Sequence, residues 1–573
     1  MILITSFMRG AIVVGLVLLA ACGSDSSVAT SSSLSLGQSS DHTGPQTVTL
    51  DGGTDGADYV AVLVNTNFNA ASSESFTMQG SALVAPVASL APGAGASLDR
   101  DGVAGAPLAL NRAFEARVRA RERSTLTPLI AGARTWNATR TPRSATITAP
   151  DGTRSYDLTR RDGALPAGVQ VGDIVTVNVN GNDACSNPIY HGARVAAIGT
   201  HAIILADTLN PANGFTTADF QRYAARFDTL VYPLDSAAFG PPTDIDANGH
   251  IGLIFTRTVN ELTPPNSNSY VGGFTFSRDL FPQVANASAG ACAASNQGEY
   301  FYLLAPDPNG TINNNRRTAG FVDSNTTAVI AHEFQHLINA GRRIYVNNAN
   351  SFEETWLDEG LAHTAEELLF YREAGLAPQG NLDTPAIRAS DQRRTAFNLD
   401  MIGNAGRYRN YLLAPSSSSP YAANDSLSTR GAAWSLLRYL ADHSGSTDNS
   451  FFFRLVNSTT TGVANVQAVY GTGFLGSLRD WSVSAATDDV AAAAAELLQP
   501  SWNWHSIYPT LYGSYPLPMQ TMTSGTSYPG TIVSGGAAFF KLGVAAGSSA
   551  SLTLAASTAT ATTNLQLVVV RMR

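Results

Sequence analysis

The sequence predicts an α+β fold whose C-terminal half is mostly helical and whose two ends are β-rich. Alternation of apolar and polar residues, typical of strands, dominates both ends of the chain, whereas helical spacing of apolar residues dominates from about residue 325 to 500. Strand and helix patterns are mixed in the segment before residue 325. With 44% hydrophobic and 14% charged residues, the 573-residue chain has the composition of a globular protein of several domains.

The first 22 residues carry the pattern of an export signal. Arg9 precedes the apolar run AIVVGLVLLA, which is too short to span a bilayer. The following Leu19-Ala20-Ala21-Cys22 resembles a bacterial lipobox, in which the signal is removed before the cysteine and the cysteine takes a lipid. An ordinary signal peptide with an incidental cysteine is the alternative. We therefore expect a lipid-anchored, extracytoplasmic protein of the bacterial cell envelope (outer membrane or cell surface), attached through Cys22.

The segment after the signal changes from a tether to strands and then to a helix. Residues 22–45 are rich in serine and have few side chains to bury, which is typical of a tether. Strand patterns begin at Gln46 (QTVTL, then YVAVLV). A helix with Leu110, Phe114 and Val118 four residues apart follows. It belongs either to a propeptide or to the packing of the folded protein, and packing is the simpler interpretation.

The middle of the chain predicts one large mixed domain, and the last residues predict strands again. Residues 143–206 are strand-rich, and an amphipathic helix capped by Thr216 or Thr217 then follows. The tail contains the strand patterns AAFFKLGV, SLTLAA and NLQLVVVRMR. The predicted order is a lipoprotein signal peptide (1–21), a serine-rich tether (22–45), an N-terminal β-rich domain with a linker helix (46–135), a large α+β domain (136–505) and a C-terminal β-sandwich-like module (520–573).

A metal-binding pattern lies on a predicted helix over residues 326–340. His332 and His336 are four residues apart, so both imidazoles lie on one side of the helix, one turn apart, and can reach the same ion. Glu333 is rotated from His332 by about 100° and can lie beside a metal-bound water without being a ligand. This is the H-E-x-x-H arrangement of zinc peptidases.

A catalytic zinc site needs a third protein ligand, and the next helix offers one. Arg342 stands six residues after His336, so the pattern with a third histidine at that spacing is absent. The segment Trp356-Leu357-Asp358-Glu359-Gly360 instead looks like the W-L-N-E-G segment of gluzincins, in which the glutamate is the third ligand. Glu359 also lies off the apolar stripe of its helix. Gly360 is expected to let the two helices approach closely.

From roughly Ala193 to His443, and most specifically from Thr326 to Glu373, the chain resembles the hyicolysin family of gluzincin metallopeptidases. The resemblance implies a zincin-like domain over residues 136–505, with one Zn²⁺ held by His332, His336 and Glu359 and with Glu333 as general base.

Two residues depart from the gluzincin pattern. Asp358 replaces a frequent asparagine, and His363 replaces an aspartate that in many gluzincins holds a zinc-bound histidine. Glu366 or Glu367 is then expected to supply that carboxylate.

Gluzincins also use a tyrosine or histidine, some distance after the third ligand, to stabilise the oxyanion. We choose Tyr421 for this catalytic role. The competing residues are Tyr408, Tyr411, His363 and His443, although His443 ends a helix and suits its C-terminal dipole.

Residues 244–249 have features of a second metal site. Asp244, Asp246 and Asn248 alternate before a glycine, as in the opening of a calcium loop, which makes Ca²⁺ a possible second cofactor. The twelfth position holds Phe255 instead of glutamate, so a tight turn is the favoured interpretation.

Further features concern the disulfide, the substrate and the partners. Cys185 and Cys292 form an even pair in an oxidising compartment, which predicts a disulfide. The strand Glu299–Leu304 is either an edge strand for an extended peptide or a core strand. The chain carries a net charge of −9 and shows no basic stripe, so nucleic acid is not expected as a partner.

The pattern as a whole predicts a secreted, lipid-anchored zinc metallopeptidase that acts on proteins or peptides. The rival hypothesis is an inactive zincin-fold lipoprotein used for binding or adhesion. A zinc hydrolase acting on non-peptide bonds is the third. A retained base together with a full ligand set favours activity.

Overall fold

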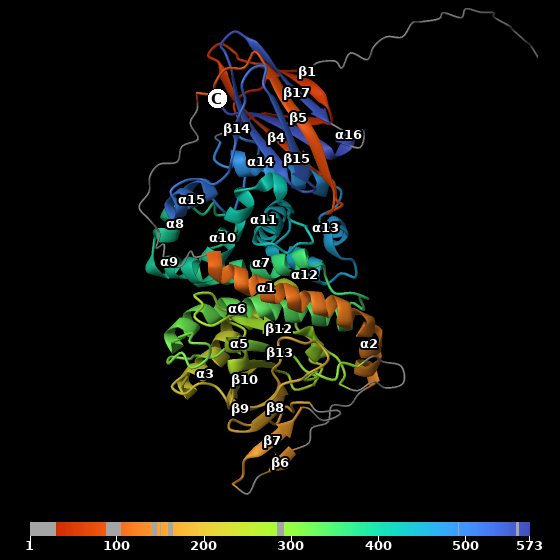
Figure 1. The fold of residues 1–573 in the computed structure, drawn as a ribbon, viewed down its shortest axis with the longest axis vertical. Helices are drawn as coiled ribbons and strands as arrows, with labels where there is room; N and C mark the ends of the chain where they lie inside the picture. The colour runs from red at the N-terminus through yellow and green to blue at the C-terminus, as the bar shows by residue number, and fades with distance from the viewer. Residues whose placement is uncertain are drawn as a thin grey trace, which may run out of the picture.

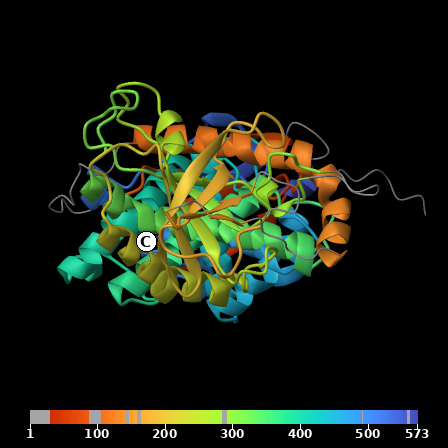
Figure 2. The ribbon, with the colours of Figure 1, turned by 90° about the horizontal axis from the view of Figure 1, so that it is seen from below.

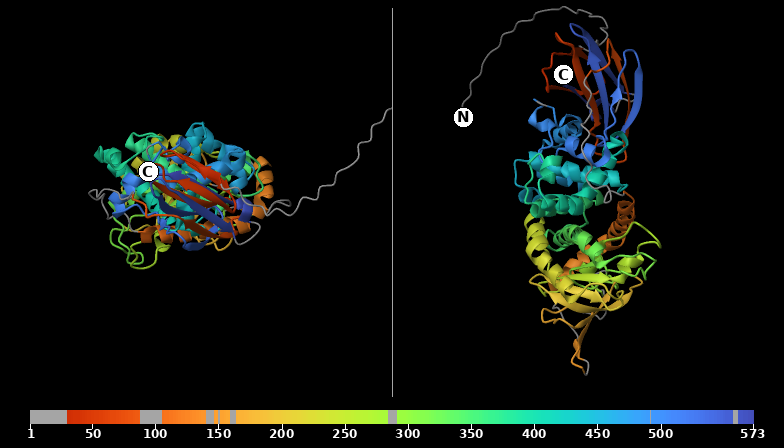
Figure 3. Two further views of the ribbon diagram at one scale, coloured as in Figure 1. Left: turned by 90° about the horizontal axis from the view of Figure 1, so that it is seen from above. Right: turned by 90° about the vertical axis from the view of Figure 1, so that its left-hand side faces the viewer.

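Three regions follow one another along the long axis of the computed structural model: a β-sandwich, a helical region and an α/β region (Figure 1). The right-hand view of Figure 3 shows the same order. The structure describes residues 30–87, 105–139, 146–148, 151–158, 164–283, 291–490, 492–556 and 561–573. The expected signal peptide and Cys22 lie outside these residues. Within the described ranges, no helix is long and apolar enough to cross a membrane.

The sandwich consists of two five-stranded sheets that take strands from both ends of the chain. One sheet has the order β1 (Thr30–Ser32), β3 (Gln46–Asp51), β17 (Ser549–Ala556), β5 (Ser73–Ser81), β15 (Ser527–Val533). The other has the order β14 (Gln520–Thr521), β16 (Ala537–Val544), β4 (Ala57–Asn65), β18 (Leu565–Arg571), β2 (Ser39–Thr43). Strand β5 alternates between buried and exposed residues, as expected for a strand with one face on the core. Strand β4 is buried throughout, because it lies between β16 and β18 and also packs against the helical region.

This arrangement differs from two separate β modules at the two ends. The N-terminal strands β3, β4 and β5 pair with β16, β17 and β18, so both ends build one sandwich. Part of the expected tether (22–45) is also strand, since β1 pairs with β3 and β2 pairs with β18. Local sequence patterns indicate that a segment is a strand but do not identify its partner, which explains the difference.

The α/β region is built around an eight-stranded mixed sheet. Its order is β12 (Gly273–Thr275), β13 (Tyr300–Leu304), β11 (Ile251–Thr256), β10 (Ala202–Asp207), β9 (Tyr190–Ile198), β8 (Ile174–Asn178), β7 (Arg154–Asp157), β6 (Thr146–Thr148). Strands β10, β11 and β13 run parallel, and β12 is antiparallel to β13. The short β12 is therefore the edge strand beside the predicted metal-binding helix. Of the two interpretations of Glu299–Leu304, the core strand is correct and the edge strand is not, because β13 lies between β12 and β11.

Helices cover this sheet. Thr216 caps α3 (Thr217–Arg226) through a capping box with Asp219, which confirms the predicted start of the amphipathic helix. The helix continues through a π-turn into α4 (Tyr232–Phe239), and α5 (Arg257–Glu261) follows β11. Helix α6 (Ala319–Gly341), capped by Thr318, packs on β12 and β13. Cys185 and Cys292 are joined in this region, so the predicted disulfide is confirmed.

The C-terminal half is helical, as expected. Helix α7 (Thr355–Ala374) packs on both α6 and α11 (Leu427–His443). A Cβ atom on Gly360 would lie 2.9 Å from Leu437 Cδ1, so this glycine allows α7 to approach α11, and not α6 as expected. The other helices are α8 (Thr384–Arg388), α9 (Asp391–Ala396), α10 (Ile402–Leu412), α12 (Asp448–Val456), α13 (Gly462–Tyr470), α14 (Phe474–Thr487), α15 (Trp504–Tyr512) and α16 (Ala561–Asn564).

One helix from the N-terminal part of the chain crosses between the helical and α/β regions. Helix α1 (Gly105–Arg121) lies across the molecule between α6 and α7 (Figure 1). Seen from below, it runs along one side of the molecule (Figure 2). A five-residue π-turn (Glu122–Leu126) follows it, and α2 (Ile130–Thr139) continues beyond.

Candidate metal centre

Two packed helices bring the predicted metal ligands together. His332 and His336 lie on α6, and Glu359 lies near the start of α7. The apolar residues of α6, among them Phe334 and Ile338, are buried in the main core, which fixes the rotation of the helix. All three predicted ligand side chains are buried as well.

The three donor atoms converge on one gap. The two Nε2 atoms of His332 and His336 are 3.2 Å apart. Glu359 Oε2 lies 3.6 Å from His332 Nε2 and 3.8 Å from His336 Nε2. Ligand atoms that bind a tetrahedral zinc ion at about 2.0–2.2 Å lie roughly 3.3–3.6 Å from one another. Two imidazole nitrogens and one carboxylate oxygen at these separations fit a zinc ion.

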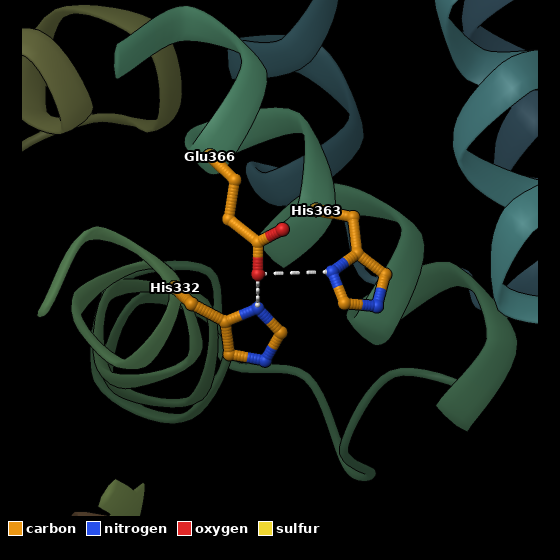
Figure 4. A group of neighbouring side chains, drawn as sticks. All are labelled: His332, His363 and Glu366. Carbon is orange, nitrogen blue, oxygen red and sulfur yellow. Dashed lines mark hydrogen bonds and ion pairs between the residues drawn. The ribbon is translucent and has the colours of Figure 1, made fainter. Parts of the chain in front are cut away.

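Carboxylates behind the histidines fix which ring nitrogen faces the gap. Glu366 Oε1 lies 2.9 Å from His332 Nδ1 (Figure 4), and Asp358 Oδ2 lies 3.0 Å from His336 Nδ1. Asn339 donates a 2.6 Å hydrogen bond to Asp358. Each Nδ1 therefore has a carboxylate oxygen within 3.0 Å, and each Nε2 points toward the gap, as is usual for metal-binding histidines. Of the two candidates for the carboxylate behind His332, the structure selects Glu366.

His363 and Arg407 hold Glu366 in place (Figure 4 draws His363). His363 Nδ1 lies 3.2 Å from Glu366 Oε1, and Arg407 Nη1 lies 3.2 Å from Glu366 Oε2. Burial, together with the charge of Arg407, lowers the pKa of His363 to about 3, so this ring is neutral. Burial raises the pKa of Glu366, but His363, Arg407 and His332 outweigh it and hold that pKa well below its usual range. Glu366 is thus an ionised acceptor for His332.

Glu333 lies beside the three donors and is held by the edge strand. The backbone N–H of Thr275 on β12 donates a 2.7 Å hydrogen bond to Glu333 Oε2. Burial raises the pKa of Glu333 above its ordinary value, and the neighbouring His332 and His336 oppose this rise only in part. A carboxylate with a raised pKa is a better proton acceptor near neutral pH, as a general base requires.

Two arginines compensate the charge of Glu359. Arg430 Nη1 on α11 lies 2.8 Å from Glu359 Oε2, and Arg119 Nε on α1 lies 4.0 Å from Glu359 Oε1. Burial raises the pKa of Glu359, but Arg430 and the histidines hold it well below its usual range. Glu359 is therefore ionised, as a metal-binding carboxylate must be.

The structure does not bring Tyr421 to this site. Its hydroxyl donates a 2.7 Å hydrogen bond to the carbonyl of Asn67, and its ring lies against Gly535 of the sandwich. The competing tyrosines, Tyr408 and Tyr411, pack in an aromatic cluster with Trp434 and Trp481. Spacing along the chain could not show that Tyr421 lies away from the site, because the long segment after α7 passes through several helices before it reaches Tyr421.

His443 is also placed away from the gap. It ends α11, and its Nε2 lies 3.2 Å from the carbonyl of Leu498. Among the competing residues, only His363 lies near the donors, and its contact is with Glu366.

The expected calcium residues form a hydrogen-bonded turn. Asp244 accepts from the N–H groups of Asn248 and Gly249, and Asn248 Nδ2 donates to Asp246 at 2.7 Å. This agrees with the favoured interpretation of a tight turn. Carboxylate oxygen atoms of Asp244, Asp246 and Glu299 also lie within 4.8 Å of one another. Calcium at this turn stays a prediction.

A cavity of about 660 Å³ opens beside the donors. Its volume is in the range of sites that bind small molecules and short peptides. The residues that line it and carry polar or ionisable groups include Glu115, Tyr270, His332, Glu333, Glu366 and Arg407.

Part of this chain is similar in sequence to a known protein. Over 156 residues the chain is 26% identical to the neutral metalloprotease ShpI of Staphylococcus hyicus. The chain is therefore similar to a metalloprotease. The match covers 27% of this chain and 32% of that relative, so the chain spans about a third of the relative's length. No protein-family model matches the chain.

This likeness suggests a metal ion, and the group of His332, His336 and Glu359 is suited to hold it. Several residues around the group are not indicated by spacing in the sequence. Thr275 comes from β12, Arg430 from α11, and Glu115 and Arg119 come from α1, more than two hundred residues before the ligands. The one signal available for α1 was its run of charged residues between apolar positions.

Proposed function

We propose that this chain is a zinc-dependent metalloendopeptidase that hydrolyses peptide bonds of proteins. One observation carries the proposal: three buried donor atoms of His332, His336 and Glu359 lie within 3.8 Å of one another, with Glu333 beside them. The likeness to a metalloprotease supports it.

Different residues of the chain accept the proton and orient the predicted ligands. Zn²⁺, when bound, polarises a carbonyl and makes water more acidic. Glu333, held by Thr275 N–H, accepts the proton from the attacking water and can pass it to the leaving amine. Glu366 and Asp358 keep the two histidines oriented.

The test combines metal analysis with digestion of a peptide library. We expect one zinc ion per chain in the wild type and in Glu333→Gln, because Glu333 is not a ligand. We expect hydrolysis to fall by more than about a thousandfold in Glu333→Gln, because an amide cannot accept the proton. Glu354→Gln, at an exposed glutamate close to the start of α7, is the control and should cleave at the wild-type rate.

A chain without zinc would overturn the proposal. A protein that binds zinc but hydrolyses no peptide, even when Glu115 and Arg119 are both replaced by alanine, would instead be an inactive scaffold used for binding or adhesion. The retained Glu333 and its hydrogen bond to β12 favour activity.

We also propose that the protein is a lipoprotein anchored at the bacterial cell envelope through Cys22, on the strength of the lipobox pattern. Labelled palmitate should be incorporated into the wild type and not into Cys22→Ser. Equal labelling of both would remove the anchor at this residue.

A further inference from the structure

Helix α1 lies where an extended substrate would have to pass. It crosses between the α/β region, which carries β12 and α6, and the helical region, which carries α7 and α11 (Figure 1). Phe114 packs on Phe274 of β12 with ring centroids 5.2 Å apart, and Val118 is fully buried beside it. The helix is therefore docked into the space between the two regions.

A carboxylate of α1 faces the metal-binding gap. Glu115 Oε1 lies 3.9 Å from His332 Nε2, close to the 3.6 Å that separates Glu359 Oε2 from the same nitrogen. The other oxygen of Glu115 pairs with Arg430, which also pairs with Glu359. Glu115 is only 2% exposed. Glu115 thus groups with His332 and Glu333 and borders the gap with a buried carboxylate.

The next turns of the same segment contact the end of β12 at Thr275 and the turn after it at Ser277. The carbonyl of Thr275 accepts a 2.9 Å hydrogen bond from Arg119 Nη2, and the N–H of Ser277 donates a 2.7 Å hydrogen bond to Glu122 Oε1. Free backbone groups of an edge strand are those with which an extended peptide pairs. Here, next to the general base, they are already paired with side chains of the α1 segment.

Packing alone does not account for these contacts. Phe114 and Val118 bury apolar surface, as any docked helix would. Glu115, Arg119 and Glu122 are 2–4% exposed, and burying charges is costly unless each finds a partner. Arg119 and Glu122 form an ion pair with each other. Beyond that pair, Arg119 contacts Thr275 and Glu359, and Glu122 contacts Ser277. Glu115 pairs with Arg430 and lies near His332.

We propose that residues 105–126 form an internal inhibitory segment that occupies the substrate cleft, with Glu115 as a carboxylate beside His332 and Glu333 and with Arg119 and Glu122 in place of the substrate backbone. The inference rests on the proposed metallopeptidase function. The cavity of about 660 Å³ leaves room for a small molecule beside Glu115, but an extended polypeptide that follows β12 must displace the segment. The protein as folded is therefore largely latent toward proteins.

The test opens the cleft by substitution in the full-length, zinc-loaded protein. The opened variant is Glu115→Ala combined with Arg119→Ala. Arg430 keeps Asp425 and Glu359 as partners when Glu115 is removed, so its charge stays paired. The probe is an alanine-rich phosphinic hexapeptide, a non-hydrolysable mimic that spans both sides of the metal, and its binding is measured by calorimetry. We expect at least tenfold tighter binding to the opened variant, and at least tenfold faster cleavage of labelled casein.

A second readout tests the position of Glu115 without activity. In protein loaded with Co²⁺, the visible spectrum should change in Glu115→Ala, because a group facing the metal has been removed. The control is Arg117→Ala, an exposed residue of the same helix, which should leave the spectrum and the hexapeptide affinity unchanged. A melting temperature for each variant shows that it is folded.

The outcomes separate the two proposals. Equal hexapeptide affinity in the opened variant and the wild type, with zinc bound in both, overturns the inhibitory segment and leaves the peptidase proposal standing. An unchanged cobalt spectrum in Glu115→Ala removes Glu115 from the metal. Failure of every form to bind zinc overturns the proposed function itself. If the double variant does not fold, Glu115→Ala alone must show the gain in affinity, and its absence there contradicts the inference.

Discussion

Two adjacent glutamates on α7 have opposite surroundings. Glu366 faces the candidate metal centre and contacts His332, His363 and Arg407, and its pKa is held well below the usual range. Glu367 faces the helical core and accepts hydrogen bonds from the indole N–H groups of Trp434 and Trp502. Burial raises the pKa of Glu367 to about 7, although Arg438 and Trp502 oppose the rise.

The comparison shows that burial alone does not identify a functional carboxylate. Both residues are buried and lie on one helix, one position apart. Their roles differ because a helix turns by about 100° per residue, so neighbouring side chains meet different helices. The face of α7 toward α6 serves the site, and the opposite face serves packing.

The largest effect is expected on the site-facing side of α7, at the ligand itself. Glu359→Gln should lower the affinity for zinc by more than about 100-fold, since loss of a residue that merely orients a ligand already costs about 10–100-fold. Competition with a chelator, followed by metal analysis, measures the change. Glu354→Gln, exposed and close to the start of α7, is the matched control and should bind zinc like the wild type. Full zinc occupancy in Glu359→Gln at the same chelator concentration would exclude Glu359 as a ligand.

A smaller effect on zinc affinity is expected at Glu366, which contacts the predicted ligand His332. Glu366→Gln should weaken zinc binding by about 10–100-fold, because His332 loses its ionised partner. Glu367→Gln should leave zinc affinity within about twofold of the wild type, because Glu367 contacts tryptophans and Arg438 instead. The same chelator titration tests both variants. Equal losses in the two would contradict the division of α7 into two faces.

Glu367, on the packing side of α7, should contribute to the pH dependence of the free energy of unfolding. The pKa of Glu367 is about 7 in the fold and near 4.5 when unfolded, so between these values the folded state holds a proton that the unfolded state has lost. The free energy of unfolding should therefore fall as pH rises through this window, by about 1 kcal/mol per pH unit from this group. Glu367→Gln, which does not titrate, should remove that part of the slope. Urea denaturation at several pH values measures it, and identical slopes in both proteins would contradict the raised pKa.

The smallest effect concerns the contact between the helical region and the sandwich. Tyr421→Phe removes the hydrogen bond to the carbonyl of Asn67 and should lower the free energy of unfolding by about 1 kcal/mol. It should leave kcat and KM for peptide hydrolysis unchanged, because Tyr421 lies away from the donor atoms. A large fall in kcat with unchanged stability would restore Tyr421 as the oxyanion donor.

The site could be predicted where its chemistry follows local spacing. His332, Glu333 and His336 lie on one helix, and Glu359 follows on the next, so helical geometry was sufficient to group them. Glu366 was one of two alternatives, and the choice required the rotation of α7 against α6. Glu115, Arg119 and Arg430 carry no spacing signal, because long-range packing alone brings α1 and α11 to the gap.

The fold was predictable to a similar extent. Segments near both ends were correctly expected to be strands, since alternation is a local property. Their pairing into one sandwich depends on packing between segments that lie hundreds of residues apart. Whether Glu299–Leu304 is an edge or a core strand stayed open in the sequence, because its outer neighbour β12 has only three residues, too few for a clear alternating pattern.

The closure of the sandwich by both ends of the chain has a consequence for how the protein reaches its folded state. Val62 of β4 pairs with Val568 of β18, so the central strand is synthesised about 500 residues before its partner. Such a high contact order makes folding slow, and β4, which is buried throughout, must stay exposed or shielded until the end of the chain is available. A chain without residues 565–571 would pair β4 with β16 on one side only and leave the other edge of β4 open. A chaperone that binds this edge during export would protect the chain from aggregation.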